Sequence, residues 1–293
     1  MKDPEHYLVR KPDYVPAPAI KNRQSPVMTL MSPEQVLEAD CRLELGWIYG
    51  VPDPNSADRE HVHDHDQIIM HISGNPSASR YLGAEVEIGI NGESLAFSTT
   101  TLAFIPRGVR HGPIAWRSVD RPHVQLVISA GIRETATVSV SSEETKTAEE
   151  YLVRTPVREV GREVKNRQMP TLTYLSRHLV PGASYYLECG WIYGMPEPNP
   201  HVFEHEHAYD ELVLHFGSDP ENPEDLGGEI EYLIEGQPLT ISTSSGLYLP
   251  RGVKHGPLIW RSFSRPHLEM TLIIGAGTFR EVWSTASFGG RTR

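Results

Sequence analysis

The chain has 293 residues, enough for one large domain or two of ordinary size, and its apolar content of 39% is ordinary for a globular protein. Its 27 Lys and Arg against 38 Asp and Glu give a formal net charge of −11, which disfavours a nucleic-acid partner or an anionic membrane surface. The N-terminus lacks the apolar run of a signal peptide, and no stretch approaches about eighteen uninterrupted apolar residues, so we expect a cytoplasmic protein with no membrane partner.

The sequence has two cysteines, Cys41 and Cys189. They are too few for a disulfide framework and form no Cys-x-x-Cys pair, so we expect neither stabilising disulfides nor a thiolate metal site. The 14 histidines are the residues suited to bind a metal.

In chain order, the first copy of an internal repeat predicts mostly short strands. The hydrophobic pattern has a period of two, interrupted by Pro, Gly and Asn clusters. We expect a two-turn helix over 33–39 and strands over 43–49, 67–72, 85–90, 101–105, 114–117 and 123–128. Asn91-Gly92 predicts a tight hairpin turn after the third strand. Short strands at regular spacing predict an all-β sandwich or barrel.

The second copy repeats this pattern at a constant offset of 144 residues. Tyr7-Leu8-Val9-Arg10 recurs as Tyr151-Leu152-Val153-Arg154, and Pro106-Arg107-Gly108-Val109 recurs as Pro250-Arg251-Gly252-Val253. A duplication without a net insertion predicts two similar domains. We place them at residues 1–140 and 141–293, because the stretch over 139–150 is polar, as a linker is.

The first copy contains His61-x-His63, Gln67 four residues later, and His111 after a Pro-x-Gly turn. Alternate residues of a strand point the same way, so these side chains can converge. Three imidazoles and an amide oxygen could bind a metal, but the missing negative charge weakens a site for a divalent ion. A metal site and a cluster of ordinary histidines both remain open for this copy.

The second copy contains the same pattern with a carboxylate: His205, His207, Glu211 and His255. Three histidines and one glutamate are a typical ligand set for a divalent transition metal with open coordination positions. Surface or core histidines in a chance pattern are the alternative, and the recurrence of the whole pattern argues against it. We therefore predict a metal site in the second domain.

Further candidates lie on the same strand faces. His215 shares a face with Glu211 and either orients ligands and substrate or is a buried histidine bonded to the backbone. Glu269 follows on a later strand, and both Glu211 and Glu269 are glutamine in the first copy, at Gln67 and Gln125. A glutamate can act as a general acid or base and an amide cannot, so our hypothesis is that the second domain performs the chemistry.

Arg251 lies in the Pro-Arg-Gly turn close to His255, and Arg107 occupies the same place in the first copy. An arginine there could bind a substrate carboxylate. An ordinary surface arginine is the equal alternative.

These motifs resemble those of the cupin superfamily in its two-domain, or bicupin, form. The resemblance covers about residues 43–129 and 187–273, and it rests on His205, His207 and Glu211 followed by Pro250, Gly252 and His255. The family's opening glycine is replaced by Asn55 and Asn199, and the asparagine of its second motif by Ala115 and Ile259. The resemblance implies that each domain is a double-stranded β-helix, an antiparallel barrel with the metal in its mouth.

The resemblance also implies a divalent Fe, Mn, Zn, Ni or Co ion, with Fe(II) or Mn(II) favoured, and one ion per chain or two if the first copy binds one. On this basis we favour a dioxygenase acting on a small oxygen-rich substrate, such as an enol, a phenol or a hydroxy or keto acid. The alternatives are a redox-neutral decarboxylase, lyase, isomerase or hydrolase with Glu269 or His215 as acid or base, and a non-enzymatic ligand-binding bicupin. The expected partners are a small-molecule substrate and further copies of the chain in a homo-oligomer.

Overall fold

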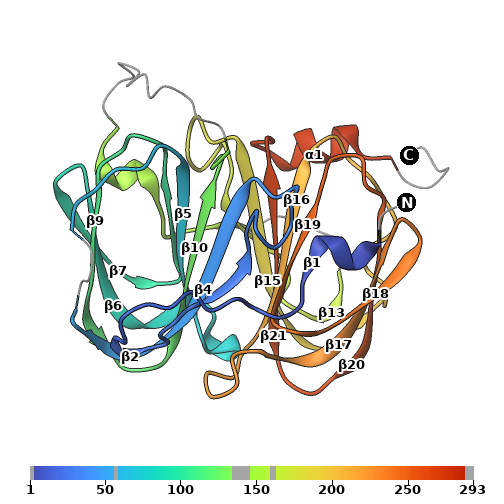
Figure 1. The fold of residues 1–293 in the computed structure, drawn as a ribbon, viewed down its shortest axis with the longest axis horizontal. Helices are drawn as coiled ribbons and strands as arrows, with labels where there is room; N and C mark the ends of the chain where they lie inside the picture. Colours follow the sequence, from blue (N-terminus) through green and yellow to red (C-terminus); the bar gives the residue numbers. More distant parts are fainter. Residues whose placement is uncertain (1–2, 56–58, 134–145, 159–162, 288–293) are drawn as a thin grey trace. The chain divides into compact units, whose positions relative to one another are not determined.

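The structure is a computed structural model that describes residues 3–55, 59–133, 146–158 and 163–287 (Figure 1). The chain divides into two compact units. The N-terminal barrel comprises Asp13–Pro33 and Asp40–Thr155, and the C-terminal barrel comprises Met1–Pro12, Glu34–Ala39 and Pro156–Arg293. The predicted domain boundary between residues 140 and 141 lies outside the described residues.

The N-terminal barrel is built from two antiparallel sheets. The larger sheet has the order β11-β8-β5-β10-β4-β2, with β3 also paired to β4, and the smaller has the order β7-β6-β9. The bounds of its elements are β2 Lys21–Arg23, β3 Met28–Met31, β4 Cys41–Asp53, β5 Asp66–Ser73, η2 Pro76–Ala78, β6 Tyr81–Ile90, β7 Glu93–Thr99, β8 Thr101–Ile105, β9 His111–Val119, β10 His123–Ala130, η3 Ala148–Tyr151 and β11 Leu152–Val153.

The C-terminal barrel repeats this arrangement. Its larger sheet has the order β1-β19-β16-β21-β15-β14-β12, with β13 also paired to β15, and its smaller sheet has the order β18-β17-β20. The bounds are η1 Pro4–Tyr7, β1 Leu8–Val9, β12 Val157–Arg158, β13 Lys165–Arg167, β14 Leu172–Leu175, β15 Tyr185–Glu197, β16 Asp210–Gly217, β17 Asp225–Ile234, β18 Gln237–Thr243, β19 Ser245–Leu249, β20 His255–Phe263, β21 His267–Ile274 and α1 Phe279–Thr285.

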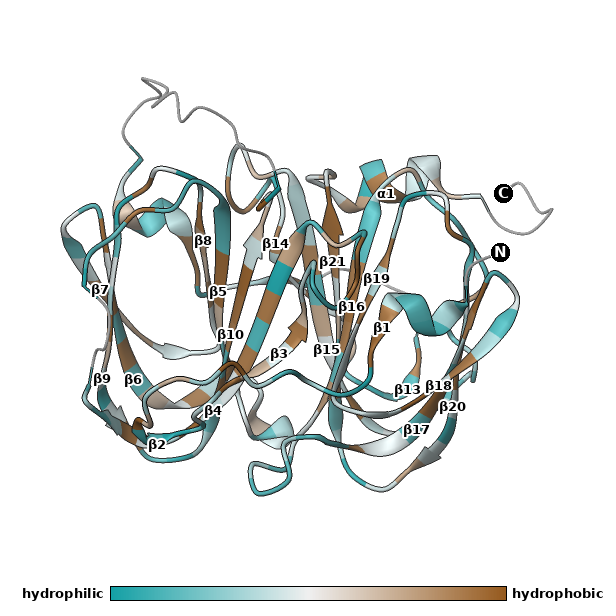
Figure 2. Cartoon of the chain, in the orientation of Figure 1, coloured by the Kyte–Doolittle hydropathy of each residue, from teal (hydrophilic) through white to brown (hydrophobic). Residues whose placement is uncertain are grey.

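The hydrophobic period explains these strands. Along β4, the buried Cys41, Leu43 and Leu45 alternate with half-buried Arg42 and Glu44, and Figure 2 shows the matching alternation of apolar and polar colour. An alternating strand buries one face against the core and leaves the other toward water. The predicted all-β fold, with one double-stranded β-helix per repeat, is confirmed.

The predicted hairpin turns are also present. Asn91 and Gly92 both adopt positive φ, 51° and 82°, and Glu235 and Gly236 do the same in the second copy. Two positive φ angles match the right-handed twist of the flanking strands, because they form a type I′ turn. Each turn therefore fixes the register of one hairpin in the smaller sheet.

The predicted helix over 33–39 is wrong: residues 33–35 and 37–38 form turns, and Val36 and Ala39 are buried among them. Two helical turns are too short to be stable by themselves, so packing of these apolar side chains decides the local shape. Among the described residues, the α-helix is α1, which begins where the side chain of Thr278 accepts a hydrogen bond from the Glu281 amide. No helix in the described part of the chain is long and apolar enough to cross a membrane.

The opening segments of the two repeats are exchanged between the barrels. Segment η1–β1 belongs to the C-terminal unit, where Leu8 pairs with Leu247 of β19. Its counterpart η3–β11 belongs to the N-terminal unit, where Leu152 pairs with Ala103 of β8. Each barrel is therefore completed by residues from the other repeat, an exchange that the duplication alone did not indicate.

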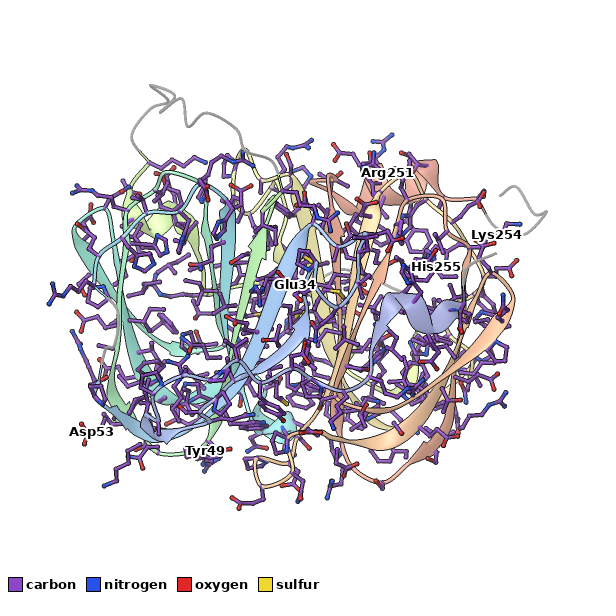
Figure 3. The ribbon with its side chains drawn as sticks, in the orientation of Figure 1. Glu34, Tyr49, Asp53, Arg251, Lys254 and His255 are labelled. Carbon is purple, nitrogen blue, oxygen red and sulfur yellow. The ribbon has the colours of Figure 1, made fainter. Side chains whose placement is uncertain are left out.

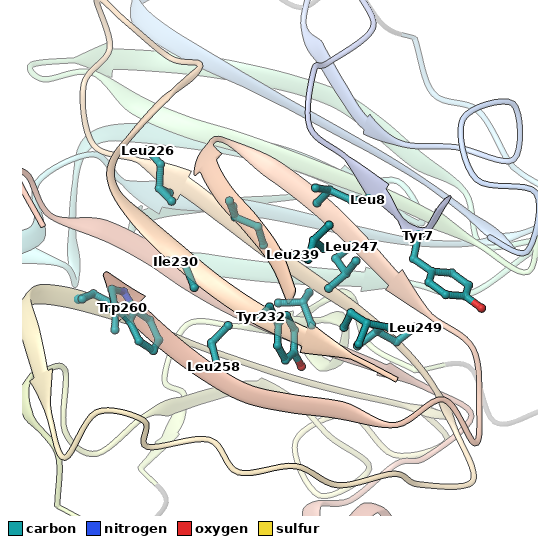
Figure 4. Packing of buried hydrophobic residues seen from close by; sticks show 14 residues of the cluster. Tyr7, Leu8, Leu226, Ile230, Tyr232, Leu239, Leu247, Leu249, Leu258 and Trp260 are labelled. Atoms are coloured by element: carbon teal, nitrogen blue, oxygen red, sulfur yellow. The ribbon is translucent and has the colours of Figure 1, made fainter. Parts of the chain in front are cut away.

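The core of the C-terminal barrel includes this exchanged segment (Figure 4). Tyr7 and Leu8 are 7% and 8% exposed and pack in one cluster with Leu247 and Leu249 of β19. Leu249 is in turn the cross-strand partner of Glu211 on β16. The N-terminal segment thus supports the strand that presents the predicted carboxylate ligand.

Leu8→Ala is expected to destabilise the C-terminal barrel by about 2 to 3 kcal/mol, because it removes a buried side chain from this core. Hydrogen exchange measures the effect locally: the amides of β19 should exchange faster, while those of β8 keep their protection. Val15→Ala, at a position 52% exposed, is the control. Unchanged protection of β19 in Leu8→Ala would show that the segment does not stabilise the barrel.

Candidate metal centre

Backbone hydrogen bonds bring the predicted ligands of the second copy together. The amide of His205 donates to the carbonyl of His255 at 2.8 Å, and the amide of His255 donates back at 2.9 Å. The amide of Gly252 donates to the carbonyl of His207 at 2.9 Å, which ties the Pro-x-Gly turn to the loop before β16. Gly256 has a φ of +90°, and a side chain there would meet the Phe203 carbonyl at 2.5 Å. Position 256, directly after the predicted ligand His255 on β20, therefore requires glycine.

The four side chains form a buried cluster. The ligand atoms of His205, His207, Glu211 and His255 lie within 4.8 Å of one another. Glu211 Oε2 is 3.0 Å from the Nε2 atoms of both His207 and His255. All four residues are at most 7% exposed, and Figure 3 labels His255 in the C-terminal barrel, with Arg251 and Lys254 of the preceding turn. The structure thus brings together the complete predicted set.

The outer nitrogens of the three imidazoles fix which atoms face inward. His205 Nδ1 lies 2.8 Å from the Phe203 carbonyl, His207 Nδ1 is 2.9 Å from the Tyr209 carbonyl, and His255 Nδ1 is 2.8 Å from the Val253 carbonyl. A carbonyl only accepts, so each Nδ1 carries a proton and each ring presents its Nε2 atom to the centre of the cluster. The tautomers suited to metal binding are therefore set by the backbone.

This arrangement fits a divalent transition metal. Three inward lone pairs and a carboxylate repel one another unless a cation or protons lie between them. Burial would raise the pKa of Glu211, but its contacts with His207 and His255 hold that pKa well below the ordinary value. Burial also lowers the pKa of His205 to about 4, and His255 adds to the effect. An ionised carboxylate beside a neutral imidazole is the state that binds a metal.

The loop that supplies two of these ligands is attached to the C-terminal helix. Trp283 of α1 stacks on His205, with ring centroids 5.2 Å apart and an interplanar angle of 28°. The amide of Glu206 donates to the Ser287 carbonyl, and the amide of Ala208 donates to the Thr285 hydroxyl. The helix therefore stabilises the position of the ligand loop, a role that the sequence did not indicate.

The first copy forms a similar but more open cluster. His61, His63 and His111 have ring nitrogens within 4.8 Å of one another, and only His111 of the three is buried. Burial is the main cause that lowers the pKa of His63 to about 4, with the neighbouring His65 next. The side chain of Gln67 lies 2.9 Å from His111 Nε2, within hydrogen-bond distance. The contacting atom is the amide oxygen Oε1, so this cluster has an uncharged acceptor where the other has the carboxylate of Glu211.

The two predicted acid–base residues lie side by side in the C-terminal barrel. Glu269 of β21 is the cross-strand partner of His215 on β16. Glu269 Oε2 is 3.1 Å from Arg167 Nε and 3.7 Å from His201 Nε2. Burial would raise the pKa of Glu269, but the charge of Arg167 and the nearby His201 hold it well below its ordinary value. Glu269 is therefore ionised and His215, whose pKa burial lowers to about 4, is neutral near pH 7.

Arg251 lies at the exposed turn. Its guanidinium group is 3.5 Å from the carboxylate of Asp210, and its amide donates to the same carboxylate at 2.8 Å. Arg107 contacts Asp66 in the same way in the first copy. The structure thus gives both arginines a structural contact, and substrate binding by Arg251 stays a prediction.

Sequence reasoning missed three residues near Glu269. Arg167 belongs to a segment repeated in both copies, and no role had been assigned to it. Tyr232 has a pKa raised well above its ordinary value by burial and by the charges of Glu211 and Glu269. His201 replaces Ala57 of the first copy, so a comparison of the two copies for further differences would have found it.

Buried histidines outside the ligand set should make the protein acid-sensitive. Burial lowers the pKa values of His123, His215 and His267 to about 4. Between that value and the ordinary 6.5, the unfolded chain binds more protons than the folded one, so stability is full above pH 6.5 and falls as the pH drops toward 4. We expect a loss of about 3 kcal/mol for each such histidine.

Chemical unfolding of metal-free protein at a series of pH values measures this loss. His178→Gln, at an exposed position, should leave the profile unchanged. Constant stability between pH 6.5 and 4 would contradict the neutral, buried state of these histidines.

Comparisons with known proteins identify the fold. Neither a protein-family model nor a curated protein sequence matches the chain. Among solved structures, AerE from Microcystis aeruginosa superposes with a TM-score of 0.55 at 16% identity, covering 92% of this chain and 99% of that one. The 7S globulin of Momordica charantia superposes with a TM-score of 0.56 at 10% identity, covering 92% and 84%. A variant of Bacillus subtilis oxalate decarboxylase superposes with a TM-score of 0.52 at 10% identity, covering 88% and 74%.

The chain has the bicupin fold. The matches span both barrels, as the internal duplication of the chain predicts. Because their names include both a globulin and a decarboxylase, the fold is shared by proteins of different function, and the function of this bicupin has to be argued from its side chains.

Proposed function

We propose that the C-terminal barrel of this bicupin is a metal-dependent enzyme site for a small oxygen-rich organic substrate, such as an enol, a phenol or a hydroxy or keto acid. The observation that supports it is the buried cluster of His205, His207, Glu211 and His255, whose Nε2 atoms are directed inward by backbone carbonyls. A divalent ion held by these four side chains would polarise substrate oxygens and stabilise negative charge.

In the same barrel, Glu269 is the group that would move a proton. It is ionised, so it can accept a proton and become neutral, and the Arg167 guanidinium would stabilise and orient the carboxylate before the transfer. The corresponding residue of the first copy is Gln125, which cannot accept a proton. This difference between Glu269 and Gln125 supports the proposal that the C-terminal barrel performs the reaction.

The proton-transfer residue favours a redox-neutral reaction, namely decarboxylation, elimination, isomerisation or hydrolysis. The similarity to a structure named oxalate decarboxylase is consistent with that class. A dioxygenase is the second candidate, and the observation that favours it is the ligand set itself, because three imidazoles and one carboxylate also suit Fe(II) or Mn(II). Such a reaction needs dioxygen, whereas the redox-neutral one does not.

Turnover with and without oxygen separates the two. Protein loaded with Mn(II) or Fe(II) is incubated with a panel of hydroxy, keto and enol acids in air and under anaerobic conditions, with His205→Ala as the control. Equal turnover in both conditions is expected for the redox-neutral enzyme. Turnover that requires air would identify a dioxygenase. Tight metal binding without turnover of any acid would contradict the enzyme proposal and leave a ligand-binding bicupin.

A further inference from the structure

A second group of polar residues lies in the C-terminal barrel, apart from the metal ligands. We call it the inner polar cluster, and it consists of Arg167, His201, His215, Ser245 and Glu269. His215 stands at its centre, because it pairs across the sheet with Glu269 on one side and with Ser245 on the other. These residues come from β13, the loop before β16, and strands β16, β19 and β21.

Several polar atoms of the cluster are buried without a partner. Both ring nitrogens of His201, both ring nitrogens of His215 and the Ser245 hydroxyl have no hydrogen-bond partner within the described part of the chain. His215 and Ser245 are each 1% exposed. A buried donor or acceptor left unpaired costs free energy, so most such groups in folded proteins are satisfied by protein, water or ligand. The cluster therefore offers several converging hydrogen-bond sites.

The N-terminal barrel does not offer the same sites. The counterpart of Ser245 is Thr101, whose hydroxyl donates to the Thr99 carbonyl at 2.8 Å. Gln125 replaces Glu269, and the sequence has Ala57 in place of His201. His71, the counterpart of His215, does have two ring nitrogens that are unpaired among the described residues, and His123 Nδ1 is unpaired there as well. The unpaired His201 and Ser245, together with the carboxylate of Glu269, thus distinguish the barrel that carries the three-His, one-Glu site.

The charges within the cluster select the kind of group that it would bind. Arg167 and Glu269 neutralise each other across 3.1 Å. His215 is uncharged near pH 7, because burial lowers its pKa to about 4. A second carboxylate would meet Glu269 without an unpaired cation to balance it, which is unfavourable in a buried site. Uncharged groups that both donate and accept hydrogen bonds fit better, and hydroxyl groups are of that kind.

Glu269 is also oriented to receive such a donor. Its contacts with Arg167 and His201 both use Oε2, which leaves Oε1 to accept a hydrogen bond. His201 is held in place by Trp260, on which it stacks with centroids 4.8 Å apart and an angle of 22°. Trp260 in turn donates to His267 at 3.0 Å, so the indole is fixed. The tryptophan thus borders the cluster and can report on its occupancy.

We propose that the inner polar cluster binds uncharged hydroxyl groups of the substrate, and that the substrate is therefore a polyhydroxylated acid of the sugar-acid type rather than a simple dicarboxylate. The assignment rests on the proposed function, in which the carboxylate or carbonyl end of the substrate is bound at the metal ligands. Glu211 and His215 share one face of β16 four residues apart, about 13 Å along the strand. A hydroxylated chain reaches further from the metal ligands toward the cluster than a short dicarboxylate does.

The experiment compares two probes, D-gluconate and malonate, by calorimetry on metal-loaded protein and by its tryptophan fluorescence, to which Trp260 contributes. Glu269→Gln copies the residue of the first barrel, so it should fold, and Ser245→Ala removes one unpaired hydroxyl. We expect gluconate to bind more tightly than malonate to the wild type. Each of the two substitutions should weaken gluconate binding about tenfold or more, because each removes a hydrogen-bonding group, while malonate binding and metal affinity stay unchanged.

The other outcomes separate this inference from the proposed function. If gluconate binding is lost in His205→Ala but unchanged in Glu269→Gln and Ser245→Ala, the hydroxyl site is refuted and holds water only. That result would still support the metal site. Gluconate binding lost in Glu269→Gln but unchanged in His205→Ala would refute the link to the metal. Malonate that binds as tightly as gluconate would overturn the proposed substrate class.

Discussion

Glu211→Gln is expected to lower the affinity of the C-terminal site for a divalent metal by at least about 100-fold while the barrel stays folded. The carboxylate contributes the only negative charge among the four ligands and lies 3.0 Å from the Nε2 atoms of both His207 and His255. An amide of the same shape keeps an uncharged oxygen near those nitrogens, as Gln67 Oε1 lies 2.9 Å from His111 Nε2 in the first barrel. The fold therefore tolerates the change and the metal site does not.

Competition with a chromophoric chelator measures this affinity. The matched variant is Gln67→Glu, which introduces the carboxylate into the first barrel and should strengthen metal binding there. An unchanged affinity in Glu211→Gln would mean that the carboxylate is not a ligand. If circular dichroism shows that Glu211→Gln is unfolded, the expectation that the barrel tolerates glutamine here, as the first barrel does at Gln67, is wrong.

Arg167→Ala is expected to destabilise the C-terminal barrel by about 3 to 5 kcal/mol near neutral pH, because it leaves the ionised Glu269 buried without its cation. The two side chains are 14% and 8% exposed and 3.1 Å apart. Glu269→Gln should cost much less, because an amide carries no charge to compensate. Chemical unfolding of the two single variants and of the double variant gives the coupling between them.

The penalty of Arg167→Ala should also depend on pH. Without the arginine, burial raises the pKa of Glu269 above its unfolded value, so the variant recovers stability relative to the wild type as the pH falls and the carboxyl group takes up a proton. Adding Glu269→Gln to Arg167→Ala should restore most of the lost stability at pH 8. A double variant as unstable as Arg167→Ala alone would show that the arginine acts through packing and not through charge.

Local sequence patterns were sufficient to predict the strands and hairpins. A period of two specifies which face of β4 is buried, and Asn91-Gly92 specifies the turn that closes β6 onto β7. The exchange of η1–β1 and η3–β11 could not be predicted in this way. The duplication makes β8 and β19 closely similar edges, so the sequence of an opening segment fits either barrel, and only the path of the chain decides between them.

The candidate metal ligands were predictable because three of them lie close together in sequence and the Pro-x-Gly turn brings in His255. The predicted strand through His205 and His207 is wrong, because both lie in the loop before β16 and only Glu211 is on the strand. Arg167 and His201 were not predictable, since they approach Glu269 from segments 102 residues and 68 residues away in the chain. Their proximity depends on how the strands pair in the folded barrel.

Elemental analysis of protein purified without added metal tests the central claim most directly. It is made on the wild type and on the matched variants His205→Ala and His61→Ala, one for each barrel. We expect close to one divalent transition metal ion per chain, retained in His61→Ala and lost in His205→Ala, because the carboxylate-containing set is in the C-terminal barrel. No metal in the wild type even after reconstitution, or a metal lost in His61→Ala and retained in His205→Ala, would contradict the account.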